Sequence, residues 1–177
     1  TVWLADPFRP TKDLDLLGFG DTAVQSIAAA FRAICQQDVP DDGLIFDVDG
    51  LIAEPIREEQ QYGGVRVRTK ALLGKTRIPI QVDVGFGDAI TPAPNEIEFP
   101  SLLHPEGPHL KAYPRETVVA EKFQAIVALG IANSRMKDFY DLLALSRLFS
   151  FDGRILAAAI RATFDRRQTS IPSRRPA

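Results

Sequence analysis

Aliphatic and polar residues alternate with a period of two along much of the first half of the chain. Residues 77–84 show it most clearly, with an aliphatic side chain at every second position and Gln81 and Asp83 between them. This alternation is typical of a strand with one buried face. Similar patterns predict strands over residues 11–17, 44–48, 51–56 and 65–73. The short connections favour an antiparallel or mixed sheet, and Asp49-Gly50 predicts a hairpin between residues 44–48 and 51–56.

Other segments have helical periodicity. Residues 22–37 repeat apolar side chains every three to four positions and follow Asp21, a residue type that caps helix N-termini. Three further helices are predicted over residues 116–129, 136–149 and 155–164, bounded by Pro114, Gly130 and Asp152. Residues 88–113 hold five prolines and predict a connecting segment, and residues 168–177 predict a frayed tail.

These elements predict an α+β protein with a mixed or antiparallel sheet and a C-terminal helical segment. We expect one domain over residues 1–112 and the helical segment over residues 113–177, with the active site in the cleft between them. The chain begins with Thr1 inside an apolar run, so we expect the natural protein to extend further upstream.

Composition restricts the partners and the compartment. The net charge of −2 excludes a chain that is strongly attractive to nucleic acid as a whole. Local basic groups occur on residues 66–70 and near the C-terminus, where they fit either RNA phosphate contacts or a solvated surface. Cys35 has no second cysteine to pair with, and no signal peptide or membrane-spanning run is visible, which favours the cytoplasm and a buried structural thiol.

Carboxylates provide the candidate chemistry. Alternation places Asp13 and Asp15 on the same face of a strand, about 7 Å apart, and Asp83 faces away from the apolar side of its own strand. Neighbouring carboxylates repel unless a cation neutralises them, and Mg²⁺ prefers such hard oxygen ligands. The second Asp-x-Asp, Asp47-Val48-Asp49, is assigned mainly to a turn because Gly50 follows it.

Three segments carry a family resemblance: Arg9-Pro10-Thr11-Lys12-Asp13-Leu14-Asp15-Leu16, Gln81-Val82-Asp83-Val84-Gly85, and Glu121-Lys122-Phe123-Gln124-Ala125 continuing to Arg135-Met136-Lys137-Asp138-Phe139-Tyr140-Asp141-Leu142. In this order and spacing, the chain resembles the AbiEii/AbiGii nucleotidyltransferase family of abortive-infection and type IV toxin–antitoxin systems. The resemblance implies a polymerase-β-like nucleotidyltransferase core that moves a nucleotide from an NTP to RNA, with the tRNA 3′ end as acceptor, and an antitoxin partner.

The same resemblance assigns roles to individual residues. It implies that Asp13, Asp15 and Asp83 bind magnesium and that Asp138 is an acid of the helical motif near the site. Lys122 matches a lysine that contacts the phosphates of the nucleotide, and Arg135 is a weaker match for a phosphate or RNA contact. Without the resemblance, these charged helical residues also fit a snorkelling lysine, a solvated face or a structural salt bridge.

Two alternatives remain open at this stage. The family carries a Gly-rich turn ten to twelve residues before Asp-x-Asp, which would fall before Thr1, so a non-catalytic module that binds an antitoxin or RNA is one of them. The other is a haloacid-dehalogenase-like phosphatase, with Asp47 as nucleophile and Asp49 as acid/base. Residues 51–84 disfavour the phosphatase, because they predict successive strands where that fold needs a helix.

Overall fold

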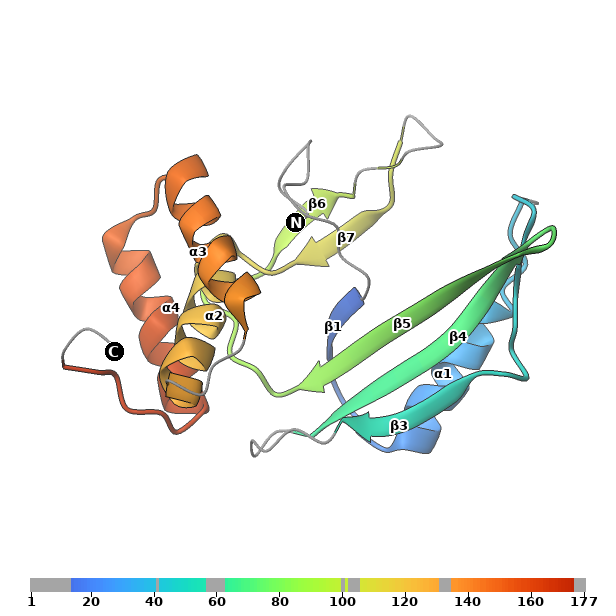
Figure 1. Ribbon diagram of the computed structural model, residues 1–177, viewed down its shortest axis with the longest axis horizontal. Helices are drawn as coiled ribbons and strands as arrows, with labels where there is room; N and C mark the ends of the chain where they lie inside the picture. The colour runs from blue at the N-terminus through green and yellow to red at the C-terminus, as the bar shows by residue number, and fades with distance from the viewer. Residues whose placement is uncertain are drawn as a thin grey trace. The chain divides into compact units, whose positions relative to one another are not determined.

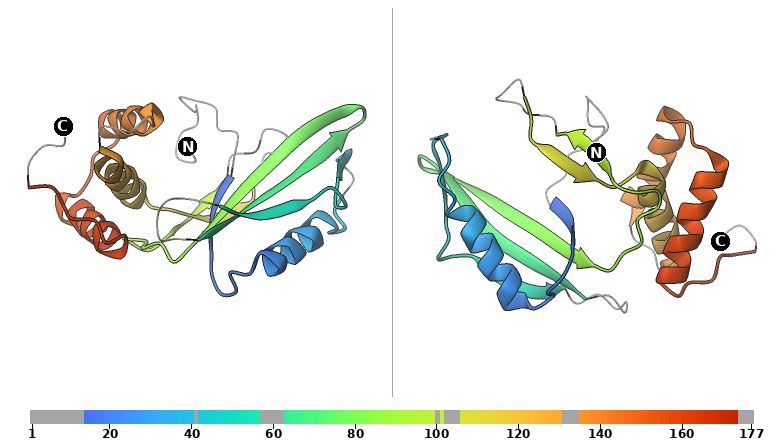
Figure 2. Two further views of the ribbon diagram at one scale, coloured as in Figure 1. Left: turned by 60° about the horizontal axis from the view of Figure 1, so that its bottom comes forward. Right: turned by 180° about the vertical axis from the view of Figure 1, so that it is seen from behind.

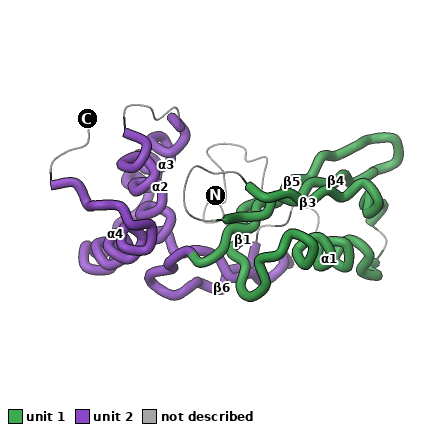
Figure 3. Tube along the Cα trace, turned by 90° about the horizontal axis from the view of Figure 1, so that it is seen from below, with its two compact units in different colours: residues 1, 8–87 green, residues 2–7, 88–177 purple. Residues whose placement is uncertain are grey.

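The computed structural model describes residues 14–40, 42–56, 63–99, 101, 106–130 and 135–173. The chain forms two compact units, one of residues 1 and 8–87 and one of residues 2–7 and 88–177 (Figure 3). In the described ranges, the first unit holds a sheet and one helix, and the second holds a small sheet and three helices (Figure 1). The division expected from the sequence, a catalytic domain over residues 1–112 and a helical segment over residues 113–177, stays a prediction.

The sheet of the first unit is mixed. Its elements are β1 (Leu14–Gly18), α1 (Val24–Cys35), β2 (Leu44–Phe46), β3 (Ile52–Ile56), β4 (Gly64–Leu73) and β5 (Thr76–Phe86). Strand β5 pairs in parallel with β1 and antiparallel with β4, and β4 pairs antiparallel with both β2 and β3. The predicted α+β class with a mixed sheet is therefore confirmed.

Helix α1 covers one face of this sheet (Figure 2). Its apolar stripe packs on the sheet through Ala28, and the core beneath it contains Leu51, Val65 and Val67. Cys35 is half-buried at the margin of this core, and burial raises the pKa of its thiol. The thiol therefore stays protonated at neutral pH, which fits the structural role predicted from the sequence.

The predicted hairpin between residues 44–48 and 51–56 is wrong. Strands β2 and β3 do not pair with each other; they follow one another along β4, with Phe46 opposite Ala71 and Ile52 opposite Arg68. The Asp49-Gly50 turn exists, but it forms a loop within one edge of the sheet. Strand β4 is ten residues long and offers a partner to both short strands, so pairing over a long sequence distance prevails over the local turn signal.

Asp47 holds this loop together. Its Oδ1 accepts a hydrogen bond from the Gly50 N–H at 2.9 Å, and its backbone carbonyl accepts one from the Thr69 hydroxyl at 2.7 Å. We expect Asp47→Ala to lower the free energy of unfolding by about 1 kcal/mol, because one side-chain hydrogen bond to the turn is lost. Urea denaturation measures the change. Asp49→Ala, at an exposed position of the same turn, is the control and should change stability by less than about 0.5 kcal/mol.

The start of α1 also differs from the prediction. The N-cap residue is Ala23, and Asp21 accepts hydrogen bonds from the Ala23 N–H at 2.9 Å and the Ser26 hydroxyl at 2.5 Å. The hydrogen bond from Ser26 is the larger cause, and the bond from Ala23 the smaller one, of a lowered pKa of the Asp21 carboxyl. Since the folded state holds the ionised form, this contribution to stability is present above the ordinary aspartate pKa and is lost as the pH falls through the lowered one.

The second unit begins with strands β6 (Asn95–Glu98) and β7 (His109–Ala112), which pair antiparallel. The prediction of a plain connecting segment over residues 88–113 is therefore wrong in part, because prolines outside the paired stretches leave these two short strands intact. None of the helices in the described ranges combines the length and apolar character needed to cross a bilayer.

The three predicted helices are confirmed as α2 (Arg115–Leu129), α3 (Met136–Leu148) and α4 (Gly153–Arg166). Asp152 caps α4 by accepting from the N–H groups of Arg154 and Ile155. Helix α2 packs against α3 and α4, and the ring of Phe164 is fully buried beside Phe123. The predicted frayed tail is wrong at Thr169, whose N–H donates to the Phe164 carbonyl.

Candidate functional site

Two of the predicted metal-binding acids lie side by side. Asp15 on β1 is directly opposite Asp83 on the parallel strand β5. Asp83 is flanked by Val82 and Val84, which are buried opposite the core residues of β4, so the acids occupy the face of the sheet away from α1. Neighbouring strands are about 4.8 Å apart, which places both carboxylates in one small area. Asp13 lies outside the described residues.

An arginine side chain, that of Arg66, contacts one acid of this pair. Arg66 on β4 is opposite Asp83, and its guanidinium donates from Nε to Oδ1 at 2.8 Å and from Nη2 to Oδ2 at 2.6 Å. The Asp83 side chain is 16% exposed and that of Arg66 is 35% exposed. A bidentate pair of this kind fixes the plane of the carboxylate. Sequence reasoning placed Arg66 in a basic group with Arg68 and Lys70 and missed its contact with the acid.

Asp15 and Asp83 fit a magnesium ion in ligand type and position. Carboxylate oxygens are hard ligands, and two acids in register on adjacent strands present them from the same side. Within the described ranges no group of three or more His, Cys, Asp or Glu residues could hold a metal. The third acid of the predicted set is Asp13, so the set of three stays a prediction.

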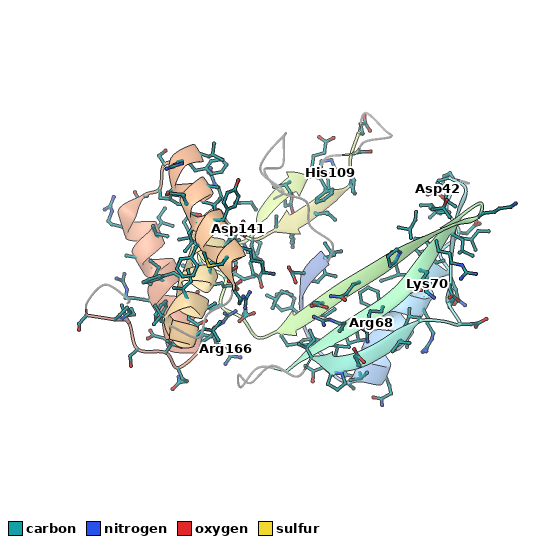
Figure 4. All side chains as sticks on the ribbon, in the orientation of Figure 1. Asp42, Arg68, Lys70, His109, Asp141 and Arg166 are labelled. Carbon is teal, nitrogen blue, oxygen red and sulfur yellow. The ribbon has the colours of Figure 1, made fainter. Side chains whose placement is uncertain are left out.

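A second charged cluster lies inside the helical unit. Lys122 of α2 has its Nζ 3.0 Å from Asp138 Oδ1 and 2.8 Å from Asp141 Oδ2, both on α3. The Asp138 side chain is fully buried, and Arg135 Nε lies 2.9 Å from its Oδ2. Asp141, labelled in Figure 4, belongs to α3. Because both acids are buried, the solvated charged face considered from the sequence is excluded.

Another polar network in this unit was not predicted. Arg167, just after α4, donates to Asp88 Oδ1 from Nη2 at 3.1 Å and to Gln124 Oε1 from Nη1 at 3.0 Å. Gln124 is buried and in turn donates to the Thr169 hydroxyl at 2.8 Å. From the sequence, Arg167 belonged to the basic group near the C-terminus, which fitted either RNA phosphate contacts or a solvated surface. Helical spacing could have shown that residue 124 faces α4, but the arginine follows the helix and had no periodic signal.

The phosphatase alternative is wrong. Its fold needs a helix soon after the nucleophile loop, whereas residues 52–56 form β3, antiparallel to β4. Asp47, its proposed nucleophile, holds the Gly50 N–H within a turn.

The fold indicates the class of protein. A mixed sheet followed by helices is consistent with the α+β fold of a nucleotidyltransferase-like protein. The family model described as "Nucleotidyl transferase AbiEii toxin, Type IV TA system" matches residues 1–176, and the chain belongs to this family. This confirms the resemblance found in the sequence. No curated protein and no solved structure matches the chain.

Proposed function

We propose that the protein is a magnesium-dependent nucleotidyltransferase that moves a nucleotide from an NTP to a hydroxyl of RNA, specifically a tRNA 3′ end. The family supports the transferase class and the role of a toxin opposed by an antitoxin. The observation that carries the proposal is the in-register placement of Asp15 and Asp83 on one sheet face. NTPs and tRNA as substrates place the reaction in the cytoplasm.

In this proposal Asp15 and Asp83, together with Asp13, hold the magnesium ion. When bound, the ion supplies positive charge to the triphosphate and favours both the attacking hydroxyl and the leaving pyrophosphate. The protein contributes rigidity, because Asp83 lies on a strand paired on both sides and cannot move without breaking the sheet. Fixed ligands spare the reaction the cost of assembling the site.

Lys122 is the proposed phosphate-binding residue. An ammonium group has three donors, and Asp138 and Asp141 account for two of them. These buried acids hold the lysine in one orientation and leave a donor for a phosphate oxygen. Arg135 has a side chain that is 47% exposed, so it can add a second positive charge to the same ligand while bound to Asp138. Asp138 thus positions both cations.

The test is transfer of label. Incubation with each α-³²P-labelled NTP, Mg²⁺ and total RNA should place radioactivity on RNA with one nucleotide preferred, and alkaline hydrolysis should locate it at the 3′ end. Chelation of Mg²⁺ by EDTA should abolish the labelling. The non-catalytic module predicts no labelling and, in isothermal titration of Mg²⁺ and each NTP, no binding of any nucleotide.

A further inference from the structure

One row of charged side chains crosses the sheet on the face that carries the acids. Glu54 on β3 is opposite Arg66 on β4, Arg66 is opposite Asp83 on β5, and Asp83 is opposite Asp15 on β1. The four strands that carry this row belong to one sheet. Arg66 therefore lies between two acids, Glu54 and Asp83, and a third acid, Asp15, follows Asp83 at the end of the row.

Arg66 engages both oxygens of Asp83. The two hydrogen bonds of 2.8 and 2.6 Å use the guanidinium fork against the carboxylate edge. A divalent ion on Asp83 would approach the same edge and would be repelled by the guanidinium charge. Mg²⁺ also demands near-ideal octahedral geometry, which leaves little freedom to share a carboxylate with a bidentate arginine.

We propose that Arg66 is a built-in competitor for the divalent ion, so that the Asp83 carboxylate is held either by Arg66 or by the ion. The proposal rests on the proposed function, in which Asp83 is an ion ligand. Arg66 thereby sets the affinity of the site for the ion and prevents repulsion between Asp83 and Asp15 until the ion arrives.

Glu54 gives Arg66 a second position. Opposite residues on neighbouring antiparallel strands have Cβ atoms about 5 Å apart, so the released guanidinium can turn from Asp83 towards Glu54. Glu54 already binds a cation from this strand, since it forms an ion pair with Arg68. The exchange of Arg66 between two carboxylates requires a change of side-chain torsion angles and no movement of the strands.

The test is Mn²⁺ binding to the full chain, measured by electron paramagnetic resonance of the free ion. We expect Arg66→Met to bind Mn²⁺ about tenfold more tightly than the unchanged protein, because one bidentate ion pair no longer has to be broken. Arg66→Lys, which keeps the charge without the fork, should lie between them. Lys70→Met is the matched control. It removes a positive charge from the same face of β4, about 14 Å along the strand from Arg66. Its affinity for Mn²⁺ should lie within about twofold of that of the unchanged protein.

Glu54→Gln tests the second position. In the unchanged background it should weaken Mn²⁺ binding about threefold, because the released arginine loses its acceptor. In the Arg66→Met background it should have no effect, since Glu54 is about two strand spacings from Asp83 and its direct field is largely screened there. An equal weakening in both backgrounds would overturn the exchange between carboxylates.

The remaining outcomes separate this inference from the proposed function. Equal affinity of Arg66→Met and the unchanged protein, with weaker binding by Asp83→Asn, overturns the competition and leaves Asp83 as a ligand. Mn²⁺ binding that Asp83→Asn does not weaken overturns both. If Arg66→Met does not fold, the test uses the NMR signal of the Arg66 Nε–H in the unchanged protein, identified by its absence from the spectrum of Arg66→Lys. Saturating Mg²⁺ should shift this signal, because Arg66 leaves Asp83. A signal that does not move overturns the inference.

Discussion

Replacing Asp15 by asparagine is expected to lower nucleotide transfer by about 10²-fold or more while leaving the fold unchanged. Asparagine keeps the shape of the side chain and removes the negative charge that would hold the magnesium ion, and loss of one charged group of this kind costs several kcal/mol of transition-state stabilisation. Asp15 is exposed on β1, and asparagine fills the same space there. Initial rates with labelled NTP measure the effect, and circular dichroism checks the fold.

Asp83→Asn, Asp83→Ala and Asp13→Ala should give losses of the same order. Asp83 also accepts both hydrogen bonds from Arg66, so its variants need the additional check of thermal stability. Asp49→Asn is the matched control, because Asp49 belongs to the second Asp-x-Asp of the chain and lies exposed in a turn. Its activity should equal that of the unchanged protein. Full activity in Asp13→Ala, Asp15→Asn and Asp83→Asn would reject the assigned site.

The face on which Asp83 lies could be predicted from the sequence. Alternation in residues 77–84 places Asp83 on the other face of the strand from Val82 and Val84. In the structure both valines are buried and Asp83 lies on the other face. Local signals also sufficed for two of the C-terminal helices, since Pro114, Gly130 and Asp152 bound α2 and α4 as expected. Periodicity and caps act over a few residues, so they need no knowledge of the remote chain.

The pairing of the strands was harder to predict from the sequence. The Asp49-Gly50 turn predicted that β2 and β3 pair with each other, but both pair with β4. A turn sets a local direction, while the pairing partner depends on which long strand can cover both short ones. The partner of Arg66 did carry a signal: a two-residue turn at residues 74–75 pairs Leu73 with Thr76, and counting back along both strands places Arg66 opposite Asp83.

Burial of the helical charges could not be read from the sequence. Asp138 and Asp141 are three residues apart, which predicts that they share a face of α3, but spacing does not say whether that face meets solvent or α2. The outcome is set by Lys122, which comes from another helix and lies 3.0 Å from Asp138 and 2.8 Å from Asp141. One partly exposed lysine between the two acids makes their burial tolerable.

That arrangement leads to the second large expected effect. Lys122→Met should lower the free energy of unfolding by about 3 kcal/mol, because it removes the cation shared by two buried carboxylates and keeps the length of the side chain. The lower end of the usual range applies, since the lysine side chain is 21% exposed and Arg135 still pairs with Asp138. Urea denaturation followed by the helical circular dichroism signal at pH 7 measures the change.

Two controls separate charge from packing. Lys137→Met removes an exposed lysine next to Asp138 on the same helix α3 and should change stability by less than about 0.5 kcal/mol. Adding Asp141→Asn to Lys122→Met should recover part of the loss, because a neutral amide needs no cation when it is buried. If the double variant is less stable than Lys122→Met alone, packing of the lysine stem holds α2 against α3. If Lys122→Met itself has the stability of the unchanged protein, the two acids are hydrated and cannot fix the lysine for a phosphate.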